Sequence, residues 1–290
     1  MNGIFPSELG NLVHLEVLRL NENQISGTIP DAFGNVMLKV LDLTGNKITS
    51  FPASIGSMES LEYLSFANND LAGSIPSGIE GLTSLLEVSL GQNSLTGIVP
   101  DFSASNNLVS LRLGSNNFDN QTFPISIINL EALRDLRMNG CGLTGEIPTR
   151  MGEFFPNLLN LHLQDNYLTG AIPSSLVDIL PLEDLNLHNN QLVGTIPTEL
   201  TFLSVLKTMS LSNNQLSSTI PASIGGLESL QILTLENNDL TGTIPHSISV
   251  MTELEIMDLS YNKLTGKIPD GIGQMSSIRK YSILPIMDLA

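Results

Sequence analysis

The chain is poor in cysteine and in basic residues, and each shortage excludes a class of protein. One cysteine among 290 residues cannot form an internal disulfide, so packing alone must stabilise the fold. This count fits a reducing compartment or a piece of a longer protein. Lysine and arginine number 12 against 29 aspartate and glutamate residues, a formal charge of −17. Binders of nucleic acid or anionic lipid normally show the opposite balance, so we expect neither as a partner.

Long apolar runs are missing as well. No stretch reaches 18 consecutive apolar residues, and Met1 is followed directly by polar and turn residues. The sequence therefore indicates neither a membrane span nor a secretory signal. Apolar residues still make up 41% of the chain against 14% charged residues, which is ample for a buried core.

Proline and asparagine recur with a fixed period. Twelve of the 15 prolines, from Pro6 to Pro269, stand 24 residues apart, except for one spacing of 22 and one of 25. A second series runs beside them, in which one cysteine replaces asparagine; its members are Asn23, Asn46, Asn69, Asn93, Asn116, Cys141, Asn166, Asn190, Asn214, Asn238 and Asn262. The count indicates about eleven full repeats, with partial repeats at both ends.

The order of residues inside one repeat predicts its structure. Leu233 and Leu235 alternate with Thr234 and Glu236, which is the period of a strand with one buried face. Because one strand cannot bury its leucines alone, stacked repeats should form a continuous parallel sheet. The asparagine series falls where the chain turns, and an amide offers the donor and acceptor that a structural ladder needs. Glycine and proline then predict an extended flank, and the residues after each proline predict short turns or single helical turns.

The repeat from Leu230 to Pro245 reads L-x-x-L-x-L-x-x-N-x-L-x-G-x-I-P. This pattern resembles the plant-type leucine-rich repeat of receptor-kinase ectodomains, receptor-like proteins and polygalacturonase inhibitors, from Gly3 to about Ile278. The resemblance implies an α/β solenoid, a right-handed superhelix with a parallel concave β-sheet. We expect one repeat domain over 1–282, with full repeats over about 12–274, and an apolar tail over 283–290.

The cysteine-paired end caps that extracellular members of this family usually carry have no counterpart in the sequence. We therefore expect an excerpt of a longer gene product, at the cell surface or outside the cell. A complete cytoplasmic protein is the alternative, since the sequence indicates no signal peptide, membrane helix or disulfide.

No motif supports an enzyme. The stretch from Gly140 to Gly145 matches the dinucleotide-binding pattern G-x-G-x-x-G, but Pro148 follows too soon for the helix that this site requires. Cys141 occupies a ladder position, where we expect a buried and unreactive thiol. The four histidines lack the spacing of metal ligands. We expect no metal, no cofactor and no catalytic activity.

The outward positions of the strands are the candidates for ligand binding. Arg112, Arg137 and His162 fall at the same position of three successive strands, with Asn186 and His188 on the strand that follows. Such a row could bind a carboxylate, a sulfate or an acidic sugar through bidentate contacts. The alternative is that the aspartates of the same face, Asp135, Asp165 and Asp184, neutralise it as surface ion pairs. Tyr63 is a further candidate, in an apolar patch near the beginning of the chain.

These observations favour a recognition scaffold that binds a protein, a peptide or a polysaccharide through its concave face and flanks, in cell-surface signalling or defence. The peptide receptors of the family often hold a ligand carboxylate with an Arg-x-Arg pair, and this chain contains none. The alternative function is adhesion or ice binding through rows of Ser, Thr and Asn, but Arg, Asp, Gly and His interrupt these rows. The one glycosylation sequon of the sequence is Asn120-Gln121-Thr122.

Overall fold

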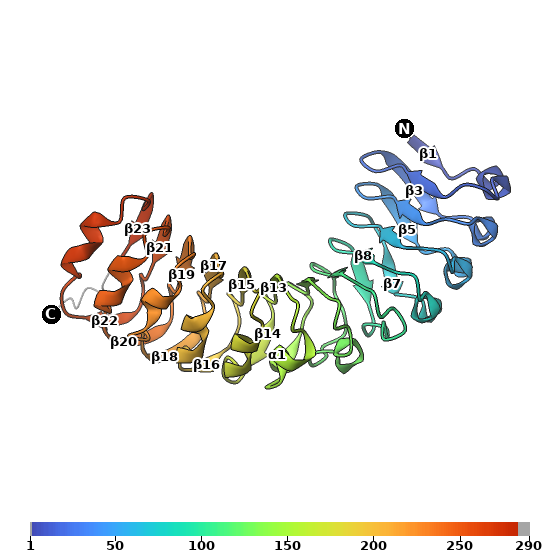
Figure 1. The fold of residues 1–290 in the computed structure, drawn as a ribbon. Helices are drawn as coiled ribbons and strands as arrows, with labels where there is room; N and C mark the ends of the chain where they lie inside the picture. Colours follow the sequence, from blue (N-terminus) through green and yellow to red (C-terminus); the bar gives the residue numbers. More distant parts are fainter. Residues whose placement is uncertain (1, 284–290) are drawn as a thin grey trace. The chain divides into compact units, whose positions relative to one another are not determined.

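The computed structural model describes residues 2–283, which divide into two compact units between Gly142 and Leu143. Each unit is a stack of repeats in which a strand, a turn, a flank segment and a short helix follow one another (Figure 1). Apart from Ile283, the expected tail over 283–290 lies outside the described residues. The boundaries that we expect for the repeat domain stay predictions.

In the first unit, every repeat contributes one strand to a parallel sheet. The strands, in their order across the sheet, are β2 (Val17–Arg19), β4 (Val40–Asp42), β6 (Tyr63–Ser65), β8 (Glu87–Ser89), β10 (Ser110–Arg112) and β11 (Asp135–Arg137). Equivalent leucines pair across the strands, as Leu18 does with Leu41 and Leu41 with Leu64. These leucines point into the core, so each strand buries its apolar face against its neighbours.

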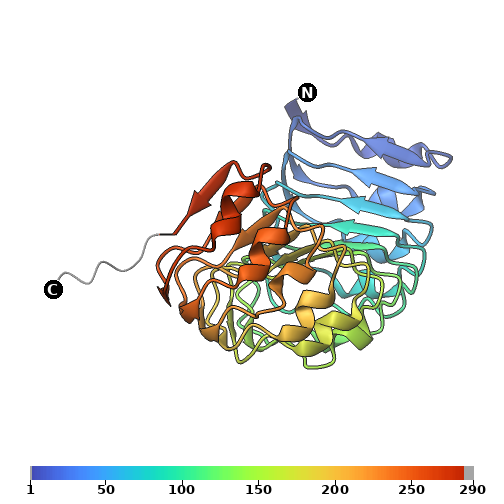
Figure 2. The ribbon, with the colours of Figure 1, turned by 60° about the vertical axis from the view of Figure 1, so that its left-hand side comes forward.

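The second unit repeats this arrangement (Figure 2). Its strands are β13 (Asn160–His162), β15 (Asp184–Asn186), β17 (Thr208–Ser210), β19 (Ile232–Thr234), β21 (Ile256–Asp258) and β23 (Lys280–Ser282). The pairing of Leu185 with Met209 and of Met209 with Leu233 keeps the same register. A parallel sheet built from alternating apolar and polar positions is therefore what the repeat produces in both units.

The flank is more ordered than the extended segment that glycine and proline predict, because neighbouring flank segments pair as short parallel strands. These strands are β1 (Asn2–Ile4), β3 (Gln24–Thr28), β5 (Lys47–Ser50), β7 (Ala72–Ser74), β9 (Ser94–Thr96), β12 (Thr144–Glu146), β14 (Tyr167–Thr169), β16 (Val193–Gly194), β18 (Gln215–Thr219), β20 (Asp239–Thr243) and β22 (Lys263–Thr265). Within the described residues, the repeat with one extra residue between Asn116 and Pro124 has no flank strand. In the shortened repeat the register shifts, between Gly27 and Thr28 of the neighbouring strand.

Short helices follow the prolines of the series, except for Pro100, after which the chain forms turns, and both outcomes match the sequence prediction. They are the 3₁₀ helices η1 (Ser7–Asn11), η2 (Asp31–Asn35), η3 (Ala53–Ser57), η4 (Ser77–Gly81), η5 (Ile125–Ile127), η6 (Ser174–Asp178), η7 (Thr198–Phe202), η8 (Ile224–Gly226), η9 (His246–Val250) and η10 (Asp270–Gln274), and the α-helix α1 (Met151–Phe154). Pro245, which precedes η9, has a φ of −62°. This is the angle that the proline ring imposes, so the residue fixes how the chain enters the helix.

The residue before each ladder position has left-handed backbone conformation, with φ between 52° and 59° at the non-glycine residues. These are Glu22, Asn68, Gln92, Ser115, Asp165, Asn189, Asn213, Asn237 and Tyr261. Glycine fills the same position at Gly45 and Gly140. Asparagine and glycine tolerate this conformation better than most residues, which explains why asparagine is common just before the ladder.

Candidate functional site

The ladder side chains hold adjacent repeats together. Asn190 donates from Nδ2 to the carbonyl oxygens of Leu163 at 3.0 Å and Leu187 at 3.1 Å, and its Oδ1 accepts the backbone N–H of Leu168 at 3.0 Å. Equivalent bonds are made by Asn46, Asn69, Asn93, Asn116, Asn214, Asn238 and Asn262. One amide thus satisfies backbone groups of two repeats that would otherwise be buried without partners.

The ladder contains one cysteine in place of asparagine. Cys141 contacts the carbonyl oxygen of Leu113 at 3.4 Å. Burial raises the pKa of its thiol to about 12, so the thiol stays protonated near neutral pH. Asn23 donates to Leu20 and Asn21, and Asn166 donates to Leu163 while accepting from the backbone of Leu143.

We define the strand face as the outward side chains of the main strands together with the side chain two positions after the end of each strand. On it, the first unit brings Arg112 and Arg137 side by side, because β10 and β11 pair in register. The guanidinium of Arg112 donates from Nε to Asp135 Oδ2 at 2.5 Å and from Nη1 to Glu87 Oε1 at 3.1 Å. Arg137 Nε donates to Asp135 Oδ1 at 2.9 Å.

Asp135 therefore bridges the two arginines, and only 8% of its side chain is exposed. The side chains of Arg112 and Arg137 remain 40% and 39% exposed. The four residues Glu87, Arg112, Asp135 and Arg137 balance each other in formal charge. The sequence predicts that the two arginines lie on adjacent strands, as β10 and β11 do. It leaves open whether aspartates neutralise them, and in the structure Asp135 contacts both.

Tyr63 lies on the strand face of the same unit, two strands away from Arg112 in the order β6-β8-β10. Its side chain is 40% exposed. It borders a small hollow of about 160 Å³ that Arg19, Asp42 and Glu87 also line. The aromatic ring thus lies beside charged groups instead of inside a purely apolar patch.

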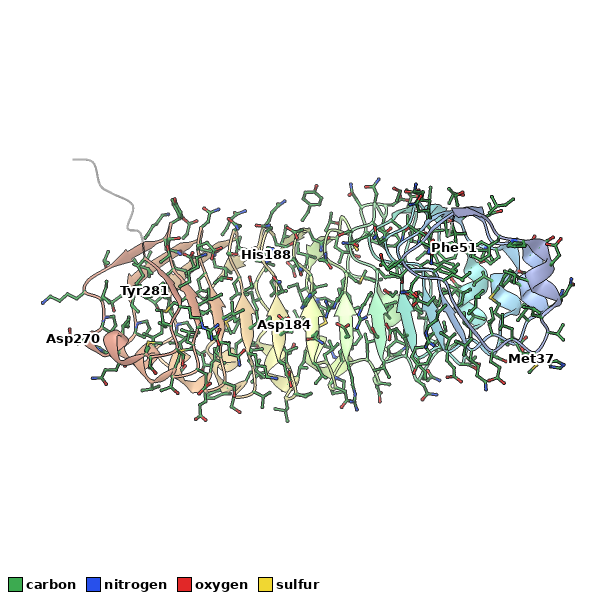
Figure 3. The ribbon with its side chains drawn as sticks, turned by 90° about the horizontal axis from the view of Figure 1, so that it is seen from above. Met37, Phe51, Asp184, His188, Asp270 and Tyr281 are labelled. Atoms are coloured by element: carbon green, nitrogen blue, oxygen red, sulfur yellow. The ribbon has the colours of Figure 1, made fainter. Side chains whose placement is uncertain are left out.

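His162, Asn186 and His188 lie on the strand face of the second unit. His162 Nε2 is 2.9 Å from Asp184 Oδ2, and 13% of the histidine side chain is exposed. His188 Nδ1 is 3.3 Å from Ser210 Oγ, and its Nε2 is 3.8 Å from Asp165 Oδ2. Both histidines therefore face aspartates, and Figure 3 shows Asp184 and His188 over the strands of this unit.

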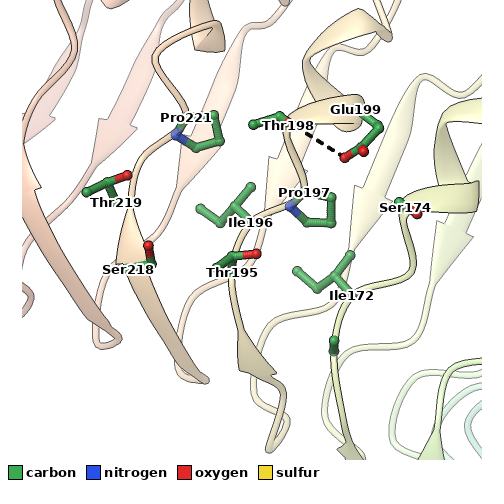
Figure 4. Close-up of a pocket in the computed structure, with 11 residues that line it drawn as sticks. Ile172, Ser174, Thr195, Ile196, Pro197, Thr198, Glu199, Ser218, Thr219 and Pro221 are labelled. Atoms are coloured by element: carbon green, nitrogen blue, oxygen red, sulfur yellow. Dashed lines mark hydrogen bonds between the residues drawn. The ribbon is translucent and has the colours of Figure 1, made fainter.

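The flank of the second unit contains a groove that the sequence analysis did not identify. It has a volume of about 410 Å³ and is lined by residues of three successive flank segments, among them Ile172, Ile196 and Thr219 (Figure 4). Glu199 is the charged residue in its lining and accepts a hydrogen bond from Thr198 Oγ1 at 3.3 Å. The recurring Ile-Pro pair is the sequence signal that could have indicated this groove.

Asn120 is exposed, in the irregular segment between β10 and η5. Within residues 2–283, no group of three or more His, Cys, Asp or Glu side chains has an arrangement that could hold a metal ion. The helices of that same part of the chain are all too short or too polar to cross a bilayer.

Comparison with known proteins finds leucine-rich repeat proteins that are similar to this chain. The model of the leucine rich repeat matches residues 13–71, 181–240 and 228–280, and a second leucine rich repeat model matches 157–179. Receptor-like protein 53 of Arabidopsis thaliana is 34% identical over 169 residues, which is 57% of this chain and 18% of that protein. Receptor-like protein 32 of the same plant is 32% identical over 185 residues, 61% of this chain and 21% of the relative.

Solved structures that are similar to this chain include plant receptors as well. The ectodomain of the Arabidopsis receptor kinase HAESA in complex with an extended IDA peptide hormone has a TM-score of 0.89 and 30% identity, with 97% of this chain and 47% of that chain covered. The plant peptide hormone receptor RGFR1 in complex with RGF2 has a TM-score of 0.85 and 31% identity, with 98% and 50% covered.

The chain thus spans about a fifth of the length of the curated relatives and about half of the solved receptor chains. The matched repeat models together cover more than half of its own residues. With the parallel strands, the ladder and the flank segments described above, this shows that the chain belongs to the leucine-rich repeat family.

Proposed function

We propose that this chain is a recognition module that binds a peptide or protein partner through its strand face, as part of a cell-surface signalling or defence protein. One observation carries the proposal. The inward residue is leucine in eight of the twelve main strands and valine, methionine or tyrosine in the others, whereas the outward residues change from repeat to repeat in charge, size and polarity. A constant frame with a varied, accessible surface suits selective contact with a partner.

The similar structures support a peptide as partner. HAESA and RGFR1 were solved with the peptide ligands IDA and RGF2, and another similar structure is the complex of PEPR1 with AtPEP1. A catalytic role has no support from the site, because the titratable groups of the strand face lie on an open sheet and pair with one another. A polysaccharide is the alternative partner.

Two areas of the strand face are the proposed contact sites. In the first unit they are Arg112, Arg137 and Tyr63, and in the second unit His162, Asn186 and His188. The guanidinium groups of the first unit are partly exposed, so a carboxylate of the partner can compete with Asp135 for them. Such an exchange depends on charge and should weaken as salt is added.

The test is to select peptides that bind the immobilised chain from a random-sequence library and to measure their affinity for variants. The double variant Arg112→Gln/Arg137→Gln should weaken acidic peptides by about tenfold, with a reduced salt dependence. The control Arg150→Gln/Arg279→Gln removes the same charge away from the strand face and should leave binding within about twofold. Selected peptides that bind both double variants equally well, and keep their salt dependence, would contradict this assignment of the arginines.

A variant that blocks the strand face at three strands, two in the first unit and one in the second, tests the wider proposal. The substitutions Ser65→Arg, Ser89→Arg and Ser210→Arg place long side chains over strands of both units. Loss of binding for most selected peptides supports the strand face as the contact surface. Unchanged binding for all of them would show that the partner contacts another surface.

A further inference from the structure

The strand face of the second unit has an unbalanced charge from β13 to β21. None of its outward residues on these strands is lysine or arginine, whereas four carboxylates lie on it or at its edge, namely Asp165, Asp184, Glu236 and Asp258. Lys207, directly before β17, pairs with Glu183 at 2.6 Å, and Lys280 on β23 lies with its Nζ 3.9 Å from Asp258 Oδ2. This surface is therefore acidic, unlike the balanced group around Asp135 in the first unit.

The same surface contains acceptor atoms that lack donors. Asp184 Oδ1, Asn186 Oδ1 and Glu236 Oε2 are buried atoms without a hydrogen-bond partner among the described residues. Gln164 Oε1, which points from the end of β13, is a fourth. An acceptor that is removed from water without gaining a donor costs about 1 to 3 kcal/mol. These four oxygens belong to the repeats of β13, β15 and β19, on side chains that are half-buried, so a side-chain rotation that brings one of them to a ligand N–H group is favourable.

The two histidines and the hydroxyls of Ser210 and Thr234 on this surface make other contacts. His162 contacts the other oxygen of Asp184, Oδ2, at 2.9 Å. His188 contacts Ser210, and the hydroxyl of Ser210 lies 2.7 Å from Thr234 Oγ1. The histidines that the sequence analysis assigned to an acidic ligand thus face aspartates, and they leave the orphan oxygens unpaired.

We propose that the strand face from β13 to β21 binds a basic peptide segment, whose lysine or arginine side chains pair with Asp184 and Glu236 and donate to the amide oxygens of Asn186 and Gln164. Charge complementarity selects this partner over an acidic one, because an anion would meet four carboxylates and, on the strands from β13 to β21, no outward lysine or arginine. The inference rests on the proposed function and specifies the ligand chemistry for the second unit.

The experiment uses the full chain and three fluorescein-labelled decapeptides of alternating serine with lysine, glutamate or glutamine, with fluorescence anisotropy at about 50 mM salt. The lysine peptide should bind most tightly. The variants Asp184→Asn and Glu236→Gln should each weaken its binding by about fivefold, because each removes one carboxylate from the contact. The variant Asn186→Lys supplies an internal ammonium next to Asp184 and should weaken binding at least as much.

Matched controls separate a local contact from a general charge effect. Asp178→Asn on η6 and Glu253→Gln after η9 make the same chemical changes at exposed positions away from the strand face. Binding within about twofold of the parent supports the proposal. Weakening equal to that of Asp184→Asn and Glu236→Gln would overturn it, since the peptide would then respond only to net charge. Circular dichroism melting curves confirm that each compared variant is folded, and Glu236→Gln serves if Asp184→Asn is not.

Tighter binding of the glutamate peptide would also overturn the inference. Failure of the proposed function looks different. If selected library peptides lose binding when the strand face is blocked but the lysine peptide does not bind, only the basic ligand is wrong. If neither the library peptides nor the lysine peptide depends on the strand face, the proposed function itself is wrong.

Discussion

At the scale of single residues, Asn190 and Asn186 show how the same side chain serves two purposes four residues apart. The amide of Asn190 is buried and satisfies three backbone groups, whereas Asn186 lies on the strand face. We expect Asn190→Ala to lower the free energy of unfolding by about 3 kcal/mol, because it leaves buried N–H and C=O groups without partners. Asn186→Ala should cost less than about 1 kcal/mol. Urea unfolding followed by circular dichroism measures both.

Similar losses for these two variants would show that the ladder does not stabilise the repeats through its hydrogen bonds.

The periodicity was sufficient to predict which asparagines form the ladder, because burial and turn position recur together. It was insufficient to predict the partners of Arg112 or His162. Those depend on which side chains face each other across strands that lie more than 20 residues apart in sequence.

At the scale of secondary-structure elements, β18 contains a residue in an unfavourable conformation. Ser218 has a φ of 70°, while the equivalent positions on neighbouring flank strands are Gly194 and Gly242. A left-handed conformation costs a residue with a Cβ about 1 to 2 kcal/mol. Glycine avoids this cost, but the greater entropy that it gives the unfolded chain offsets part of the resulting gain in the free energy of unfolding. We therefore expect Ser218→Gly to raise the free energy of unfolding by about 0.5 kcal/mol, as measured by urea unfolding.

The adjacent residue of the same strand supplies the control. Ser217 does not have a positive φ, so Ser217→Gly should lower the free energy of unfolding by about 0.5 to 1 kcal/mol. A stabilising effect of both substitutions, or of neither, would contradict the role assigned to backbone conformation.

The elements differ in how well the sequence predicts them. The main strands follow from alternating leucines, and the helical turns follow from proline. The flank strands do not follow from any pattern within one repeat, because each forms by pairing with the flank segment of another repeat, as Gly145 pairs with Leu168.

At the scale of the whole molecule, the proposed cell-surface location predicts a covalent modification. Asn120 is exposed in an irregular segment, and such a sequon is accessible to N-glycosylation in the secretory pathway. Expressed behind a secretion leader in eukaryotic cells, the chain should carry one N-glycan. A shift in electrophoretic mobility on treatment with peptide N-glycosidase F measures it.

Two variants identify the site. Asn120→Gln should abolish the mobility shift, and Thr122→Ser, which keeps the sequon, should preserve it. A secreted parent chain without any shift would show that the oligosaccharide is not added at this segment.

The alternation of inward leucine and outward polar residues has a consequence for how such proteins diverge. Leu185 and Leu187 maintain the core, while Asp184, Asn186 and His188 between and beside them remain at the surface. Ligand preference and folding are thereby assigned to different residues of one short strand. New specificities can then arise by successive substitutions, each of which leaves the protein stably folded.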